Sequence, residues 1–175
     1  MKKTKKTVLS ATISAASVVV QLLGTVIPSL ELTAAAITGI PLFIIKSELG
    51  LTYSLLSYLT VSTLSLLLLP DKIAVLSYIF FFGIYPIFKK DIERLGKVFS
   101  WIIKLSLFNL LFSGCIYIGK VVLMVEDPLF SFSILPYIVA NFAFVMYDIA
   151  MTMFLSLYET KYKNKPYFKR LFNGK

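Results

Sequence analysis

Six apolar segments follow one another along the chain, at approximately 8–27, 29–45, 51–69, 73–88, 98–122 and 129–158. A helix crosses the hydrocarbon core of a membrane in about 20 residues, with a range of about 17–25. The 175 residues are 58% hydrophobic, and a soluble domain of that length has too much surface to hide so many apolar side chains. The pattern therefore predicts an all-α, polytopic membrane protein. We expect a single domain over residues 1–175, built as a bundle of six transmembrane helices.

The second and fourth segments are short, and both contain glycine and proline. The second includes Gly39 and Pro41, in "TGIP", and the fourth includes Gly83 and Pro86, in "FFGIYP". Since proline removes a backbone hydrogen bond and glycine weakens a helix, we expect breaks at these places. The sixth segment is long enough to tilt or to extend beyond the membrane surface, and residues 159–175 form a basic tail after it.

Basic residues are distributed unevenly between the two ends of these segments. If the chain starts on the inside, only Lys72 and Lys120 lie on the outside, and Lys104 lies within a segment. The other fifteen of the eighteen lysines and arginines lie on the inside: Lys2, Lys3, Lys5, Lys6, Lys46, Lys89, Lys90, Arg94, Lys97, Lys161, Lys163, Lys165, Lys169, Arg170 and Lys175. Because cytoplasmic loops carry the excess of lysine and arginine, we expect a multi-pass protein of the cell membrane with both termini in the cytoplasm.

Residue types that support catalysis or metal binding are scarce. The chain has no histidine and one cysteine, Cys115, which lies in an apolar run and is expected to be a packing residue. This argues against the usual zinc ligand sets, imidazole general bases and an internal disulfide bond. The sequence also lacks a glycine-rich phosphate loop and a recognisable activated serine. We therefore expect no enzymatic activity, no cofactor and no metal site.

Four polar side chains lie inside the fifth and sixth segments, where each is costly unless it finds a partner. Lys104 and Asp148 fall at similar depths on the inner side if the two segments pack as antiparallel helices, and Asn109 and Asn141 fall further out. We expect an intramembrane ion pair between Lys104 and Asp148. The pair is either a structural clasp or part of a proton or ion relay, and a single carboxylate without a histidine favours the clasp.

The stretch "KKDIERLGK" at 89–97 connects the fourth and fifth segments on the inner side. Its charges are spaced for pairs on one helical face, Asp91 with Arg94 and Glu93 with Lys97. Gly96 is the expected stop of this short helix.

Aromatic and amide side chains gather towards the outer ends of the last three segments. Tyr78, Tyr117 and Tyr137, together with Asn109 and Asn141, combine apolar bodies with polar tips. One interpretation is a ligand-binding pocket for a small, partly aromatic molecule. The other is the belt of interfacial tyrosines that membrane proteins carry.

Small residues occupy neighbouring rows on one face of the first segment, namely Ser10, Ala11, Ser14 and Ala15. A helix in lipid gains nothing from small side chains alone, so this face indicates the close approach of another helix. The partner is either the second segment, whose "TAAAITG" provides another smooth face, or a different protein.

With these features the chain resembles the substrate-binding S components of energy-coupling factor transporters. The shared features are the length, six spans with both ends inside, a basic N-terminus and a first helix with the pattern Ala-x-x-x-Ala, here "ATISA" at Ala11–Ala15. The chain is also similar to small membrane proteins of Gram-positive bacteria that are related to S components by fold. The resemblance implies that Ala11 and Ala15 dock against a transmembrane coupling protein that works with an ATPase module. It also implies a ligand site near the outer surface, enclosed by the last three helices.

The leading hypothesis is therefore capture of a small-molecule substrate on the outer side, for uptake by a separate ATP-driven module. An alternative is a non-enzymatic scaffold or assembly protein of the cell envelope, which needs packing faces but no pocket. A third is an autonomous carrier or channel, against which the scarcity of charge in mid-membrane argues. In every case the lipid bilayer is a partner, whereas nucleic acid is not expected, since no groove or stacking platform accompanies the net charge of +9.

Overall fold

The computed structural model describes residues 3–27, 29–121, 124, 133–163 and 165, and these form helices joined by short connections, without any strand. The elements in chain order are α1 (Lys3–Val26), α2 (Glu31–Leu49), α3 (Leu51–Leu68), α4 (Lys72–Ser77), the π-helical η1 (Tyr78–Phe82), α5 (Tyr85–Glu93), α6 (Lys97–Val121), α7 (Ile134–Leu157) and the π-helical η2 (Tyr158–Tyr162). Since α4, η1 and α5 join into one helix, as do α7 and η2, six helices are long and apolar enough to cross a membrane. They are Lys3–Val26, Glu31–Leu49, Leu51–Leu68, Lys72–Glu93, Lys97–Val121 and Ile134–Tyr162. The predicted all-α architecture with six potential spans is confirmed for this part of the chain.

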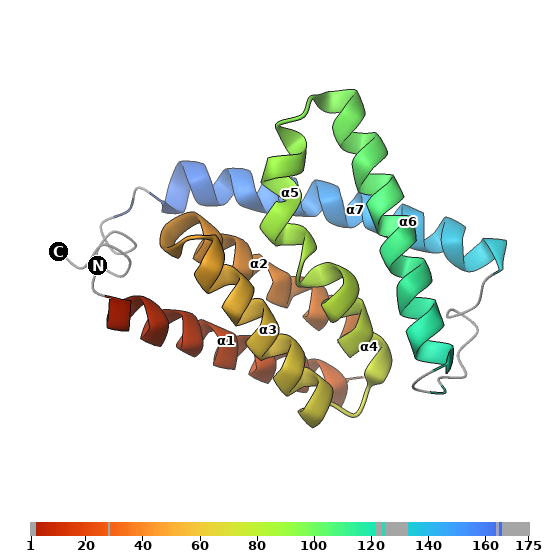
Figure 1. The fold of residues 1–175 in the computed structure, drawn as a ribbon, viewed down its shortest axis with the longest axis horizontal. Helices are drawn as coiled ribbons and strands as arrows, with labels where there is room; N and C mark the ends of the chain where they lie inside the picture. The colour runs from red at the N-terminus through yellow and green to blue at the C-terminus, as the bar shows by residue number, and fades with distance from the viewer. Residues whose placement is uncertain (1–2, 28, 122–123, 125–132, 164, 166–175) are drawn as a thin grey trace.

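The first three helices pack on one another as an up-and-down group (Figure 1). A buried chain of hydrogen bonds links all three, because Gln21 of α1 donates to Thr38 of α2 at 2.9 Å and accepts from Ser65 of α3 at 2.7 Å. Gly24 lets α1 approach α2 closely, since a Cβ there would overlap Ala34. The linked polar side chains satisfy one another, as polar groups inside an apolar bundle must, and they hold the three helices in register.

The break expected at Pro41 is absent, and α2 continues to Leu49. The residues beyond the proline are packed rather than free, with Leu42 and Ile45 buried in the core that α2 shares with its neighbours. Tertiary packing of this kind stabilises a helix more than local propensity does, and it outweighs the cost of one interior proline.

The fourth potential span, formed by α4, η1 and α5, extends beyond residue 88, where the sequence predicts its end. Asp71 caps its start by accepting hydrogen bonds from two backbone amides, and the expected break near Gly83 is a π-helical segment followed by a turn. The chain remains helical after this irregularity, with Pro86 in the first turn of α5, where proline is tolerated, and with Ile87 buried. The helix therefore ends only at Glu93.

The fifth potential span, α6, and the sixth, formed by α7 and η2, complete the bundle. They lie on the other side of the fourth span, which is formed by α4, η1 and α5. In Figure 1 α5 and α6 form a hairpin, and α7 passes behind both of them. The last turns of α7 reach α2, where Phe43 packs against Met151 and Leu155. Residues 129–132, expected in the sixth span, and residues 164 and 166–175 of the expected basic tail lie outside the described residues.

Candidate functional site

A cavity of about 440 Å³ lies between α2, the helix formed by α4 and η1, α6 and α7. It is built from the first turns of α2, from α4 and η1, from the second half of α6 and from the first half of α7, so it extends from the middle of the bundle into the half away from the chain termini. Its lining residues are Leu32, Thr33, Ala36, Ile73, Ser77, Phe80, Phe81, Phe82, Phe108, Leu111, Phe112, Cys115, Pro136, Val139, Ala140, Ala143, Phe144 and Tyr147.

Apolar side chains make up nearly all of the cavity wall, and six of them are phenylalanines. Among the described residues no charged side chain lines the cavity, and the polar ones are Thr33, Ser77 and Tyr147. The hydroxyl of Tyr147 is buried and has no hydrogen-bond partner among the described residues. The wall therefore offers extensive apolar contact, while the unsatisfied hydroxyl of Tyr147 lies buried behind it.

Three phenylalanines, Phe81 of η1, Phe108 of α6 and Phe144 of α7, line the cavity near the middle of the bundle, and we call them the aromatic floor. Phe108 and Phe144 are stacked with ring centroids 4.6 Å apart, and Phe81 meets them edge-on at 5.0 and 5.3 Å. Tyr85 does not line the cavity but stacks on Phe81 at 5.0 Å. Stacked and edge-to-face rings attract one another beyond their burial, so the floor is a packed partition rather than a loose plug.

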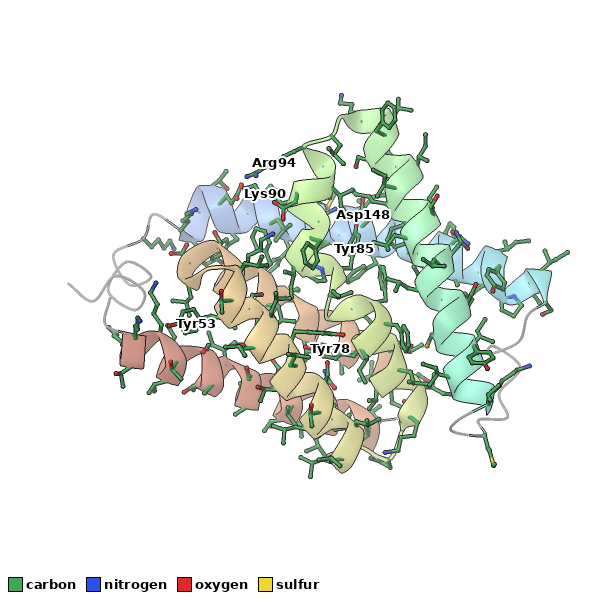
Figure 2. The ribbon with its side chains drawn as sticks, viewed as in Figure 1. Tyr53, Tyr78, Tyr85, Lys90, Arg94 and Asp148 are labelled. Carbon is green, nitrogen blue, oxygen red and sulfur yellow. The ribbon has the colours of Figure 1, made fainter. Side chains whose placement is uncertain are left out.

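Four charged side chains meet next to Tyr85 and form what we call the ion cluster: Lys89 and Glu93 of α5, Lys104 of α6 and Asp148 of α7. Asp148 accepts hydrogen bonds from Lys104 at both carboxylate oxygens, at 2.9 and 3.0 Å, and also from Lys89 and the hydroxyl of Tyr85. Glu93 accepts from Lys89 and Lys104, each at 2.7 Å. Figure 2 shows Tyr85 and Asp148 side by side where α5 crosses α7.

The ion cluster is balanced in charge, since two ammonium groups face two carboxylates. Lys89 is fully buried, Lys104 and Asp148 are nearly so, and the side chain of Glu93 is 35% exposed. Buried charges are stable only when each has partners of opposite sign and satisfied hydrogen bonds. Because both oxygens of Asp148 are engaged, the geometry suits a clasp that joins α5, α6 and α7 better than a relay. The structure thus brings Lys104 and Asp148 into direct contact.

None of the protein-family models, curated proteins or solved structures compared with the chain matches it. The cavity, the ion cluster and the exposed faces of the helices are therefore the basis on which a function is inferred.

Three of the five residues expected to bind a ligand lie together. Asn109 and Asn141 pair across α6 and α7 through reciprocal hydrogen bonds of 3.0 and 2.9 Å. Tyr137 lies one turn from Asn141, and its hydroxyl hydrogen-bonds Ser113 at 2.7 Å. Tyr137 and Asn141 also line a second, more open hollow beside the first turns of α7. Their polar groups already have partners within the bundle, so they hold α6 against α7.

The other two expected ligand residues lie elsewhere. Tyr78 is fully buried in the core that η1 shares with the first three helices, and Tyr117 is 57% exposed on α6. Neither lines the cavity. The five residues therefore do not form one site, and sequence reasoning missed the aromatic wall that the structure shows. The available signal was the run "IFFFG", in which consecutive phenylalanines precede Gly83.

The two rows of small residues on α1 have different surroundings. Ser10, Ser14 and Ser17 are buried against the neighbouring helices, and the hydroxyl of Ser14 donates to the carbonyl of Ser10 in its own helix at 2.9 Å. Ala11 and Ala15 are exposed. The close approach predicted from this face is therefore made within the chain by the serine row, while the alanine row remains exposed.

Proposed function

We propose that this chain is the substrate-binding membrane subunit of an uptake transporter of the energy-coupling factor type, similar in fold to S components. The proposal depends on one observation, the cavity of about 440 Å³, whose volume is in the usual range for small-molecule sites. The cavity extends into the half of the bundle away from the termini. With both termini in the cytoplasm, as the basic residues indicate, it takes up its substrate from the outer side of the cell membrane.

The aromatic floor and the ion cluster favour capture over conduction. A molecule that enters the cavity meets the stacked rings of Phe81, Phe108 and Phe144 half-way through the bundle. The ion cluster ties α5, α6 and α7 together next to this floor through Tyr85 and Asp148. Release on the other side requires these helices to rearrange, and the sequence carries no phosphate-binding loop to power such a change. In this proposal a separate ATPase module supplies the energy.

The exposed alanines of α1 supply a docking face for the transmembrane coupling protein. Small residues let the backbones of two helices approach closely, so a partner helix can lie along Ala11 and Ala15. A larger side chain at Ala15 holds such a partner away. It does not disturb the core of this chain, because Ala15 is exposed.

Affinity purification from membranes of the native host in mild detergent tests the proposal. We expect the unmodified protein to retain a second membrane protein and an ATPase in fixed stoichiometry. Ala15→Leu should lose both partners while remaining monodisperse and folded. Ala16→Leu is the matched control, since it adds the same bulk to an exposed alanine on a different face of α1 and should retain both partners.

Two outcomes count against parts of the proposal. Equal retention of the partners by Ala15→Leu and Ala16→Leu would place the coupling contact on another surface. A complete lack of an ATPase with the unmodified protein would contradict the transporter function and favour the scaffold alternative. Mass spectrometry of the purified scaffold should then detect lipid as the only bound small molecule.

A further inference from the structure

Three sides of the cavity are closed by direct packing between helices. Between α2 and η1 the backbones approach so closely that a Cβ at Gly39 would overlap the carbonyl oxygen of Phe82. Between α4 and α6, Leu76 packs against Cys115 and Ile116. Between α6 and α7, the stacked rings of the aromatic floor and the hydrogen-bonded pair of asparagines hold the helices together. A ligand therefore has no path into the cavity through these three sides.

The fourth side of the cavity, between α2 and α7, is different. These two helices pack together near the end of the bundle that carries the termini, where Phe43 contacts Met151 and Leu155. Towards the other end both helices still line the cavity, but several of the lining side chains are exposed. They are Leu32, Thr33, Val139 and Ala143. Side chains from two helices that line one cavity and yet remain exposed indicate that the side between those helices is open.

The depth of this open side matches the hydrocarbon core of a membrane. On α2 it begins at Leu32, directly after Glu31, where the second potential span starts. On α7 it reaches Ala143, and the helix rises about 14 Å from Ile134 to that residue. This rise is roughly half the thickness of a hydrocarbon core. In a membrane the open side therefore faces lipid chains along much of one leaflet.

The chemistry of the wall restricts what can occupy the cavity. A water molecule in a cavity needs about two to four polar partners, and among the described residues the wall offers few hydroxyl groups. A charged group would lose its hydration on entry without meeting a counter-ion, since no described charged side chain lines the cavity. A hydrocarbon chain from the bilayer loses no hydration, and it gains dispersion contacts with the apolar wall.

We propose that the cavity binds an uncharged hydrocarbon chain, which enters sideways from the outer leaflet through the open side between α2 and α7. This inference rests on the proposed function that the cavity is the capture site, and it makes the substrate a lipophilic molecule that is dissolved in the membrane before capture. The chain belongs either to a bilayer lipid or to a free single-chain molecule, since both present the same methylene groups to the wall. The competing route is direct entry of a polar substrate from water.

Photochemical labelling of the full-length protein in reconstituted vesicles tests the class of ligand and its route. Two probes carry a diazirine in the middle of a hydrocarbon chain, one a phosphatidylcholine and the other a long-chain alcohol. A third probe is a charged, water-soluble diazirine added outside the vesicles. Mass spectrometry should find adducts of a chain probe on Cys115 and Phe144, which are buried and line the cavity. Leu110, which is exposed and does not line the cavity, reports contact with bulk lipid.

Variants at the two edges of the open side assign the labelling to this route. Ala143→Trp adds bulk at the edge formed by α7 and should lower the adducts on Cys115 at least about fivefold, because the added ring competes with the chain for space. Adducts on Leu110 should not change. Thr33→Trp blocks the edge formed by α2 and keeps the test decisive if the first variant does not fold. Ala150→Trp is the matched control, since it alters an exposed alanine of α7 outside the cavity and should be labelled normally.

Each result supports or overturns the inference. Cavity adducts of the phosphatidylcholine support a lipid chain as the occupant, and adducts of the alcohol alone support a free single-chain molecule. Labelling of Leu110 without Cys115 and Phe144 would overturn the hydrocarbon ligand. Cavity adducts of the water-soluble probe, or equal labelling in the blocking variants and Ala150→Trp, would overturn the sideways route.

The outcome is separable from that of the proposed function. A lack of cavity adducts while an ATPase still co-purifies would refute the ligand class and leave the transporter function intact. Cavity adducts that the blocking variants reduce, without a co-purifying ATPase, would do the reverse.

Discussion

Asp148 receives hydrogen bonds from two neighbouring helices, from Lys89 and Tyr85 of α5 and from Lys104 of α6. The two lysines and the aspartate are almost inaccessible, so water does not replace a lost partner. Without the Asp148 carboxylate, both ammonium groups would depend on Glu93. Removing one partner of a buried, hydrogen-bonded ion pair typically lowers the free energy of unfolding by about 3–5 kcal/mol. An exposed ion pair contributes about 1 kcal/mol or less to that free energy.

Asp148→Asn should therefore destabilise the protein strongly. We expect a loss of about 3 kcal/mol or more, because the substitution leaves an excess positive charge in the interior. The measurement is thermal unfolding of the detergent-solubilised protein. Arg94→Gln is the control, since it removes the predicted surface pair with Asp91, which is 3.7 Å long and mostly exposed, and should change the unfolding temperature little.

A second substitution distinguishes charge imbalance from a general packing defect. In Asp148→Asn with Lys104→Met, Lys89 and Glu93 remain as a balanced pair, so this double variant should be more stable than Asp148→Asn alone. An equally unstable double variant, or an Asp148→Asn protein that unfolds at the same temperature as Arg94→Gln, would contradict the clasp interpretation.

Contacts between deep polar residues were accessible from the sequence, but the full ion cluster was not. Lys104 with Asp148 and Asn109 with Asn141 can be paired because each couple lies at one depth on antiparallel helices and has few other partners available. Lys89 is different. The predicted end of the fourth span at residue 88 places it in a separate short helix on the aqueous inner side, whereas the helix of the fourth span continues and buries it completely.

Glu93 shows why local spacing was misleading in the same stretch. Four-residue spacing predicts Lys97 as its partner, but the helix ends before Gly96, whose φ of +98° is a left-handed conformation. The two residues therefore do not lie on one helix, and Glu93 binds the lysines of the ion cluster instead. Tertiary neighbours outweighed helical periodicity here.

At the scale of elements, the π-helical η1 determines the cavity wall. Phe80, Phe81 and Phe82 are consecutive, and in a regular α-helix three consecutive side chains point in widely different directions. All three nevertheless line the cavity, and all three lie within the π-helical segment. The hydroxyl of Tyr58 donates to the carbonyl of Ile79 at 2.7 Å and so satisfies a backbone group within the irregular segment. Helical periodicity alone could not have predicted this wall.

The position of η1 depends on Gly39 of α2. A Cβ at Gly39 would overlap the carbonyl oxygen of Phe82 and lie 2.9 Å from Cγ of Pro86. We therefore expect Gly39→Ala to destabilise the protein by about 1–3 kcal/mol, since a backbone carbonyl cannot move aside as a flexible side chain can. Thermal unfolding in detergent measures the effect.

Gly114→Ala is the matched control for this prediction. It adds the same methyl group inside α6, where a Cβ would lie 3.4 Å from the ring of Phe80, an ordinary contact. Alanine is also the better helix former, so this variant should unfold at the same temperature as the unmodified protein or slightly higher. A Gly39→Ala protein as stable as Gly114→Ala would show that α2 and η1 are less closely packed than the structure has them.

At the scale of the whole molecule, the two ends of the bundle differ. The end that carries the termini is braced by ion pairs between helices, Lys46 of α2 with Asp91 of α5 and Lys90 of α5 with Glu159 of η2. The opposite end contains the cavity. The start of α1 and the end of the helix formed by α7 and η2 lie on the same side of the molecule in Figure 1, as six membrane crossings would require. The braced end is also rich in basic residues, so we predict that it lies in the cytoplasm.

Single-cysteine labelling in whole cells tests this orientation. In a Cys115→Ser background, cysteine is introduced at exposed positions, in Thr4→Cys, Leu95→Cys and Lys163→Cys at the braced end and in Leu30→Cys at the cavity end. A membrane-impermeant maleimide should label Leu30→Cys in intact cells. It should label the other three only after the cells are made permeable.

The pattern of labelling separates two kinds of error. Labelling of all three braced-end cysteines in intact cells would show that the protein has the opposite orientation. The cavity would then face the cytoplasm and could not capture an external substrate. Labelling of Thr4→Cys without Lys163→Cys, or the reverse, would require an odd number of crossings. One of the six helices would then not span the membrane, and the bundle that forms the cavity from four of them would not be embedded as proposed. Orientation is therefore the property on which the site and the uptake function both depend, because the same cavity on the other side has no external substrate to bind.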